Sequence, residues 1–258
     1  MTNNSLSYRM HRVIDMVSHN ANQTIADVGC DHAYVSMYLV DSGFCSRSIA
    51  MDVRKGPLEI AKKNVYESGL QEKIDLRLSD GLDKLKKGEA QSIVIAGMGG
   101  NLIINILRAG IDKLTDETEL ILQPQSDIYK VRQYLYKELN YIIIEEDMII
   151  DENKFYTIIK AKHRGIELES KTEIKQNIDM YDSIDDADYS KDVEYFYGKL
   201  LLESKNEVLR QFLIKSYTNN ENILSSLKGN SSDSSSRRIK ELEHENSRIK
   251  EALDYYDM

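Results

Sequence analysis

The sequence predicts an α/β fold with a mostly parallel, Rossmann-like sheet, a terminal antiparallel hairpin and a helical appendage. Short apolar runs alternate with helical patterns five times between residues 23 and 139. Strands that are apolar throughout, each followed by a helix, indicate a parallel sheet covered on both faces. Two β-rich segments separated only by a turn then follow, and helical periodicity returns near residue 194. Five parallel strands and a hairpin give a seven-stranded sheet.

The elements of the first part follow in order from apolar periodicity and turn residues. A first helix is expected over residues 6–17, because its apolar residues recur at helical spacing. The parallel strands are expected at residues 23–28, 46–51, 74–78, 92–96 and 119–123. Helices are expected from Val35 to a stop at Gly43, from Gly56-Pro57 to Gly69, through residues 102–107, and from a Ser126 cap to residue 139, with a short helix at Leu82 and Leu85.

The hairpin and the C-terminal part have a different character. Residues 141–150 and 154–162 are β-rich and are joined by a turn, which predicts an antiparallel pair. We therefore expect one domain at residues 1–165 and a helical domain at 166–258. Residues 167–193 are acidic and polar, 194–227 are helical by pattern, and 228–236 form a linker.

The last helix has the spacing of a coiled coil. Its seam residues follow one another at intervals of 3 and 4, with one polar member: Ile239, Leu242, Asn246, Ile249, Leu253 and Tyr256. The short linker favours an internal antiparallel hairpin, and a homodimer zipper is the alternative. We accordingly expect a monomer, with a homodimer through these helices as the other possibility.

Composition bounds the function. No apolar run approaches the length of about 20 residues that spans a bilayer, and the N-terminus lacks the apolar core of a secretory signal. Cys30 and Cys45 give neither a disulfide framework nor a metal spacing, so we expect a cytoplasmic protein with no metal site. The net charge of −9 argues against nucleic acid, but 20 of the 43 acidic residues and only 13 of the 34 basic ones follow residue 165. The first part is therefore near neutral and could meet RNA on one face.

Acids and glycines stand at four successive strand ends. In a parallel sheet these ends meet at one edge, where ligands bind. The residues are Asp27 and Gly29, then Asp52, then Asp80 and Gly81, and finally Gly97 and Met98. Asp52 could accept both hydroxyls of a ribose, and Asp80 an adenine amino group, although a turn or cap would also explain either acid.

The loop after the first strand discriminates between nucleotide ligands. Asp27 and Asp31 would repel a pyrophosphate, but they suit a sulfonium and an ammonium. Asp31 and Ala33 also stand where a dinucleotide loop would have further glycines. S-adenosylmethionine therefore fits this loop better than NAD. Cys30 is either a small filler or a reactive thiol.

Several stretches resemble one family in particular. They are Leu6-Ser7-Tyr8-Arg9-Met10, residues 26–34, Asp52 with Gly56-Pro57-Leu58, residues 77–82, Ile95-Ala96-Gly97-Met98-Gly99-Gly100, and Gln123-Pro124-Gln125. Together they resemble the bacterial tRNA adenine-22 N1-methyltransferases, a class I S-adenosylmethionine-dependent family with a seven-stranded methyltransferase sheet. The resemblance covers residues 5–165, and the C-terminal helices agree in kind with the family's coiled-coil appendage. Tyr8, Met10 and Cys30 depart from the family's usual residues.

The resemblance implies transfer of the sulfonium methyl to N1 of adenine 22 in tRNA. Because N1 has a free lone pair, no base is needed, and catalysis can rest on positioning and electrostatics. The catalytic candidates are Asp31, His32 and Met98. Asp31 is the first choice to face the adenine amino group. His32 could instead bind the cofactor carboxylate or cap the helix at Val35.

The expected cofactor contacts are Asp27, Gly29, His32, Asp52, Asp80, Gly81 and Gly97, and the expected RNA contacts are Arg9, Arg12, Arg54 and Lys55. Two other functions stay open. One is methyl transfer to a small molecule or a protein, which the acidic net charge favours. The other is a non-catalytic cofactor-binding protein that docks a partner through its helical hairpin.

Overall fold

The computed structural model describes residues 6–165, 189–227 and 233–257. The chain forms two compact units, Met1–Ser183 and Ile184–Met258. Their border falls within residues 166–188, which lie outside the described residues. The expected domain boundary between residues 165 and 166 stands at the edge of that stretch and stays a prediction.

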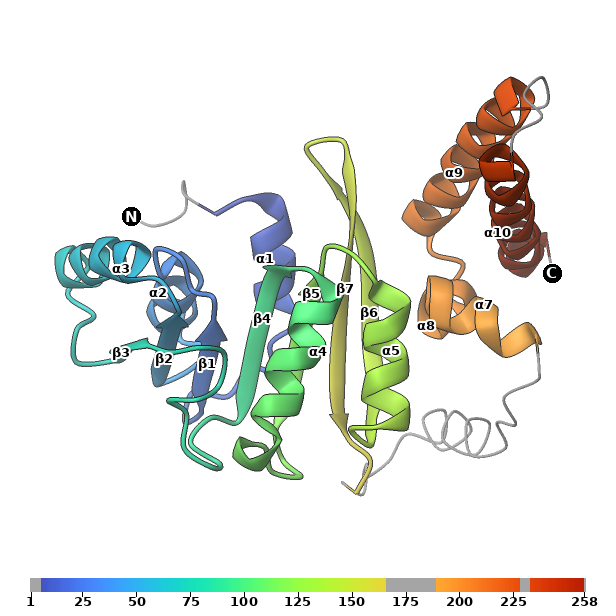
Figure 1. The fold of residues 1–258 in the computed structure, drawn as a ribbon. Coiled ribbons are helices and arrows are strands. Elements are labelled where there is room, and N and C mark those ends of the chain that lie inside the picture. Colours follow the sequence, from blue (N-terminus) through green and yellow to red (C-terminus); the bar gives the residue numbers. More distant parts are fainter. Residues whose placement is uncertain (1–5, 166–188, 228–232, 258) are drawn as a thin grey trace. The chain divides into compact units, whose positions relative to one another are not determined.

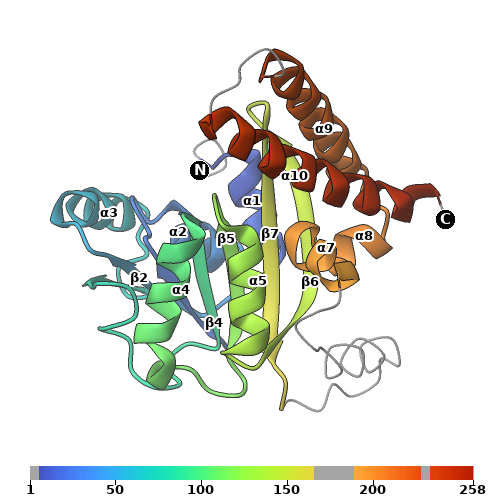
Figure 2. The ribbon, with the colours of Figure 1, turned by 45° about the vertical axis from the view of Figure 1, so that its right-hand side comes forward.

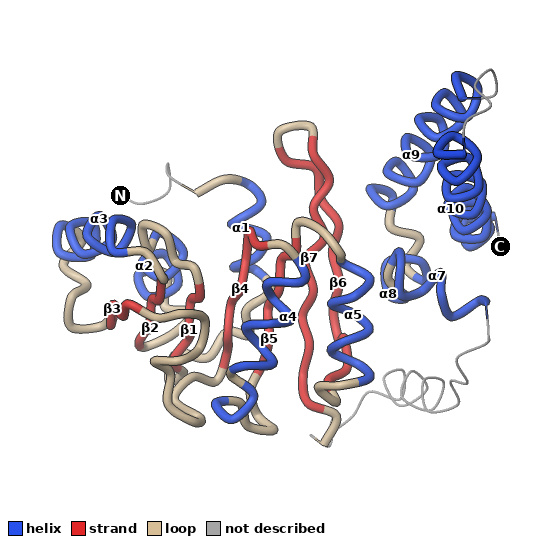
Figure 3. The backbone as a smooth tube through the Cα atoms, viewed as in Figure 1, coloured by secondary structure: helices blue, strands red, loops and turns tan. Residues whose placement is uncertain are grey.

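The first unit is built on the seven-stranded sheet that the sequence predicts (Figures 1 and 3). The strands are β1 (Thr24–Val28), β2 (Arg47–Asp52), β3 (Ile74–Leu78), β4 (Ser92–Met98), β5 (Glu119–Pro124), β6 (Tyr141–Asp151) and β7 (Lys154–His163). Their order is β3-β2-β1-β4-β5-β7-β6. β1 to β5 pair in parallel, while β7 is antiparallel to both of its neighbours. The Rossmann-like fold with a terminal hairpin is thus confirmed.

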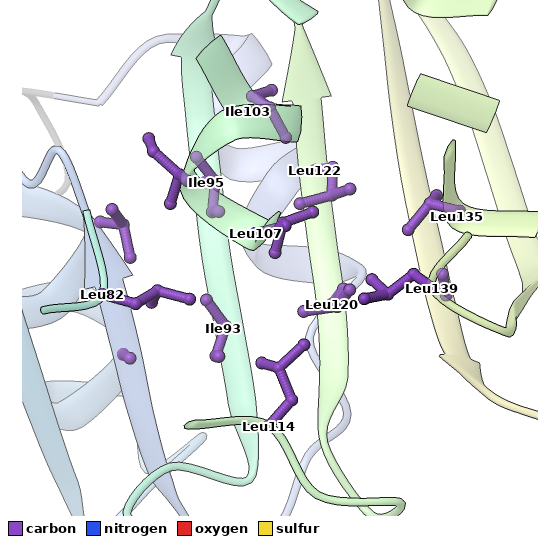
Figure 4. Close-up of a cluster of buried hydrophobic side chains, with 14 of the residues drawn as sticks. Leu82, Ile93, Ile95, Ile103, Leu107, Leu114, Leu120, Leu122, Leu135 and Leu139 are labelled. Carbon is purple, nitrogen blue, oxygen red and sulfur yellow. The ribbon is translucent and has the colours of Figure 1, made fainter. Parts of the chain in front are cut away.

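Helices cover both faces of the sheet (Figures 1 and 2). They are α1 (Tyr8–Asp15), α2 (Tyr34–Asp41), α3 (Lys55–Glu67), α4 (Gly100–Ala109) and α5 (Ile128–Lys137), with a 3₁₀ turn η1 (Ile111–Lys113). Successive strand residues point to opposite faces. In β4, Ile93 and Ile95 therefore belong to the same buried cluster as residues of α4 and α5, and Figure 4 shows Ile103 and Leu107 of α4 near Ile95, while Val94 belongs to the cluster with α1, α2 and α3.

Two local predictions were wrong. Leu82 and Leu85 belong to turns rather than to a short helix. The backbone of Gly81 is left-handed at φ 52°, and Ser79 Oγ accepts a hydrogen bond from the Lys84 N–H at 3.1 Å. Both leucines are buried. Their spacing therefore reflects two separate contacts with the core rather than one face of a helix. Ser126 does not cap α5 either. The N-cap is Asp127, which makes no side-chain cap bond.

The second unit contains α7 (Tyr189–Tyr197), α8 (Lys199–Glu203), α9 (Glu207–Leu227) and α10 (Asp233–Asp257). α9 and α10 pair antiparallel, since the hydroxyl of Tyr256 near the end of α10 donates to the Asn206 carbonyl just before α9, at 2.7 Å. Asn246 is buried, accepts from Asn220 at 3.0 Å and donates to Glu221 at 2.7 Å. The expected internal hairpin with a polar seam position is present, although α10 begins inside the predicted linker.

Among the described helices, none combines the length and the apolar character needed to cross a membrane.

Candidate functional site

A cavity of about 550 Å³ opens at the carboxyl ends of the parallel strands. The loops after β1, β2, β3 and β4 line it, together with the start of α1 and the residue after β5. Most of the predicted site residues meet there: Arg9, Asp27, Gly29, Asp31, His32, Asp52, Arg54, Asp80, Gly81, Gly97 and Met98. Arg12 and Lys55 do not line it.

The loop after β1 depends on left-handed backbone. Gly29, Asp31 and Ala33 have φ values of 76°, 49° and 62°. The N–H groups of Gly29 and Cys30 both donate to the Met51 carbonyl, at 2.8 and 2.9 Å, which ties the loop to the end of β2. A Cβ on Gly29 would overlap the Cε of Met98. Glycine is therefore favoured there by conformation, and any side chain would have to displace the end of Met98.

Asp52 is held as a buried acceptor at the end of β2. Only 4% of its surface is exposed. One carboxylate oxygen accepts the backbone N–H of Arg54 at 2.8 Å, and the other that of Asp31 at 3.3 Å. Arg54 Nε also donates to the first of these oxygens, at 3.4 Å. A carboxylate offers about four acceptor positions, so one is left for a hydroxyl in the cavity.

Asp27 is a second buried carboxylate. It accepts a hydrogen bond from Ser36 Oγ at 2.8 Å, and Ser36 in turn accepts from Ser48 Oγ at 3.0 Å. Burial raises the pKa of Asp27 to about 6, and the negative charge of Asp52 acts in the same direction. A cation bound beside Asp27 would favour its ionised form.

Asp31 and His32 lie at the rim. The Asp31 side chain is 62% exposed and lies 3.8 Å from Arg54 Nη2 and 3.7 Å from His32 Nε2. His32 does not cap α2, because the N-cap is Ala33 without a side-chain bond, so that alternative was wrong. Asp31 and His32 as contacts of the reacting groups stay a prediction.

Cys30 behaves as a filler. It is buried in the cavity wall, and burial raises the pKa of its thiol. Since the thiolate is the reactive form, the structure favours the packing interpretation over the reactive thiol. Among the described residues, no group of three or more His, Cys, Asp or Glu side chains is arranged to hold a metal ion.

Two glutamines near the end of β5 were not predicted as site residues. Gln123 is fully buried, and its Oε1 accepts both the Gly97 N–H, at 3.0 Å, and Arg9 Nη1, at 2.5 Å. The Arg9 guanidinium lies 5.0 Å from the centre of the Tyr156 ring. Gln125 lines the cavity. The signal was present, because both glutamines extend the strand-end pattern by one strand.

The predicted RNA contacts differ in their surroundings. Arg12 binds Asp147 at 2.7 Å and Asp15 at 3.0 Å, and so joins α1 to β6. Arg54 is 67% exposed at the rim, and Lys55 is exposed at the start of α3. Contact of these residues with RNA stays a prediction.

Comparisons with known proteins agree with this geometry. A methyltransferase-domain family model matches residues 6–159. The tRNA (adenine(22)-N(1))-methyltransferase of Bacillus subtilis is 43% identical over 157 residues, which are 61% of this chain and 65% of that protein. The aligned part thus spans just under two thirds of the relative. A putative tRNA methyltransferase of Mycoplasma genitalium is 28% identical over 154 residues, 58% of this chain and 67% of its own length.

Solved structures extend the match beyond the aligned part. The crystal structure of the B. subtilis tRNA methyltransferase TrmK superposes with a TM-score of 0.79 at 32% identity, covering 96% of this chain and 99% of that one. A putative tRNA (m1A22) methyltransferase of Streptococcus pneumoniae, in complex with S-adenosyl-L-methionine, gives 0.74 at 28% identity, with 96% and 99% covered. The chain therefore belongs to the methyltransferase-domain family, and within it to the group that includes the B. subtilis tRNA methyltransferase, as its motifs predicted.

Proposed function

We propose that this chain transfers the methyl group of S-adenosylmethionine to N1 of adenine 22 in tRNA. The observation that carries the proposal is that the strand-end cavity lies within the region that is 43% identical to the B. subtilis tRNA (adenine(22)-N(1))-methyltransferase. The Streptococcus relative in complex with S-adenosylmethionine supports the choice of cofactor.

The residues of the cavity fit that cofactor. Asp52 would hold the ribose hydroxyls, and Asp80 would accept the amino group of the adenine ring. Gly81 and Ile106 both line the cavity, and a Cβ at Gly81 would lie 3.0 Å from the Ile106 side chain, so glycine lets Ile106 pack closely there. Asp27 would face the ammonium and sulfonium charges, and Gly29 would let the backbone approach. When bound, the cofactor supplies a methyl group on a positively charged sulfur.

The residues of the protein then have three tasks. In the run from Gly97 to Gly100, which ends β4 and starts α4, Gly97 has no side chain at the cavity wall, which leaves space for a base beside Met98. The carboxylates of Asp27 and Asp31 provide negative potential for an adenine that becomes cationic as it is methylated. Preorganised electrostatics of this kind and the alignment of N1 with the methyl group are sufficient for catalysis, because N1 needs no deprotonation.

The tRNA would be held by Arg9, Arg54 and Lys55, with Arg12 behind them. The seam of α10 is already used within the chain, by Leu242 and Ile249 against α9, which favours a monomer. A tRNA substrate also agrees with the expected cytoplasmic location.

The experiment is methyl transfer from labelled S-adenosylmethionine to two tRNA transcripts that carry adenine or guanine at position 22. We expect label only in the adenine transcript, and salt-dependent binding of both. Equal labelling of the two transcripts, or of neither, would refute the proposal. Transfer to protein or to small molecules without tRNA would favour the alternative methyltransferase.

A further inference from the structure

The residue after β5 places a side-chain amide in the cavity that none of the cofactor contacts above uses. The N–H of Gln125 donates to the Met98 carbonyl at 2.8 Å, which fixes Gln125 beside the end of β4. A Cβ built on Gly97 would lie 3.9 Å from Gln125 Nε2 and 3.7 Å from Arg9 Nη1. Gly97 therefore leaves a gap with an amide and a guanidinium beside it.

The division of the cavity assigns this gap to the substrate. Apart from Gly97 of β4, the expected cofactor contacts come from the ends of β1, β2 and β3 and from the loops after them. Beside the Gly97 gap, the remaining wall includes α1 and the end of β5, through Arg9, Met10 and Gln125, while side chains of α2 and α4 line other parts of the cavity. A base that approaches a methyl group held near the ends of β1 and β4 meets this remaining wall.

Only one of the two glutamines can contact that base. Gln123 is fully buried, and its Oε1 already accepts from Gly97 and Arg9, so it positions them. The Gln125 side chain is exposed to the cavity and makes no hydrogen bond with another residue in the described part of the chain. Its carbonyl oxygen and its amino group are both available.

We propose that Gln125 recognises the target adenine by its Hoogsteen edge, an inference that rests on the proposed tRNA adenine methylation. N1 must face the methyl group, which leaves the neighbouring 6-amino group and N7 to be read from the side. A carboxamide matches them, since its oxygen accepts from the 6-amino group and its nitrogen donates to N7. Guanine has an acceptor, O6, in place of the amino group, so the same amide oxygen would be repelled.

The contact also assists the reaction. The N1 lone pair forms the new bond to the methyl carbon while the carbon–sulfur bond breaks and its electron pair stays on sulfur. The positive charge moves to the adenine and is shared with its 6-amino group. The Gln125 oxygen accepts a hydrogen bond from this amino group, and that hydrogen bond becomes stronger as the charge develops in the transition state. Asp31 is less suited, since its exposed carboxylate already pairs with Arg54.

The test combines a variant with a modified substrate. Gln125→Ala should lower kcat/KM for tRNA by about 10- to 100-fold, the usual worth of a bidentate base contact, while binding of S-adenosylmethionine is unchanged. Gln71→Ala is the matched control, because Gln71 is exposed in the turn before β3, at the opposite end of that strand from the cavity. Wild-type protein should also lose activity on a transcript with 7-deazaadenine at position 22, which lacks the N7 acceptor.

If Gln125→Ala and 7-deazaadenine remove the same contact, their effects on kcat/KM should not be additive. Gln125→Ala should therefore treat adenine and 7-deazaadenine alike. Full activity of Gln125→Ala, or an equal loss on 7-deazaadenine in wild type and variant, would overturn the inference while leaving the proposed function intact. Absence of methylation by the wild-type protein would instead contradict the proposed function. The wild-type measurement on 7-deazaadenine needs no variant, so a folding defect cannot hide the answer.

Discussion

In the absence of cofactor, the buried charge of Asp27 should destabilise the folded protein, although the same charge favours cofactor binding. Its carboxylate is 5% exposed, and burial raises its pKa from 3.8 to about 6. The unfolded chain therefore releases this proton at lower pH than the folded chain does. The stability contributed by the protonated group is complete below about pH 3.8, and it is lost as the pH rises past about 6. Asp27→Asn keeps an oxygen for Ser36 and removes the charge.

The gap between 3.8 and about 6 corresponds to about 3 kcal/mol. Without cofactor, Asp27→Asn should raise the free energy of unfolding by about that amount near pH 7.5, and by about half as much near pH 5. Urea unfolding followed by far-UV circular dichroism at the two pH values measures both. Asp41→Asn, an exposed change on α2, is the control. The reasoning fails if Asp27→Asn gains nothing near pH 7.5, or gains equally at both pH values.

Three further predictions concern the same site and the helical hairpin. The Kd of the wild-type protein for S-adenosylmethionine should rise as pH falls below about 6, because protonation removes the charge of Asp27; calorimetric titration that shows the same slope in Asp27→Asn contradicts this. Gly29→Ala should cost about 1–2 kcal/mol of stability from its left-handed backbone, and at least about tenfold in cofactor affinity as Met98 is displaced; unchanged calorimetric titrations and urea curves would count against it. Asn246→Leu should cost about 1–3 kcal/mol, since it leaves the Asn220 amide unpaired. Replacing both asparagines by leucine should recover most of that loss in thermal melts, and a double variant as weak as the single one would show that the pair itself stabilises the hairpin.

The strands were predictable because each is a buried apolar run that ends at a conspicuous residue. β3 was placed at its observed bounds, and Asp52 and Gly97 stand at strand ends where the pattern put them. Local spacing was a poorer guide where the backbone turns left-handed. Asp127, at φ 51°, displaced the expected cap of α5 by one residue, and nothing in the apolar pattern reports a single φ angle.

Contacts between distant residues were beyond the sequence pattern. The bond from Arg9 to Gln123 joins residues 114 positions apart, and only the folded sheet brings α1 to the end of β5. The pairing of Arg12 with Asp147 is of the same kind. Charge type suggested RNA contact for both arginines, but the partner that fixes each guanidinium depends on three-dimensional neighbours.

The attachment of α1 to the last hairpin has a consequence for biosynthesis. One wall of the cavity comes from the first helix, which is held by Asp147 and by Asp151 of β6, the latter accepting the Arg9 N–H at 3.2 Å. A nascent chain that has emerged only as far as β5 contains every strand-end acid of the cavity and Gln123, yet it lacks Asp147 and Asp151, which hold α1. The site can therefore be completed only after β6 and β7 have left the ribosome. Newly made protein should therefore complete the α1 wall of the cavity in one late step of synthesis rather than gradually.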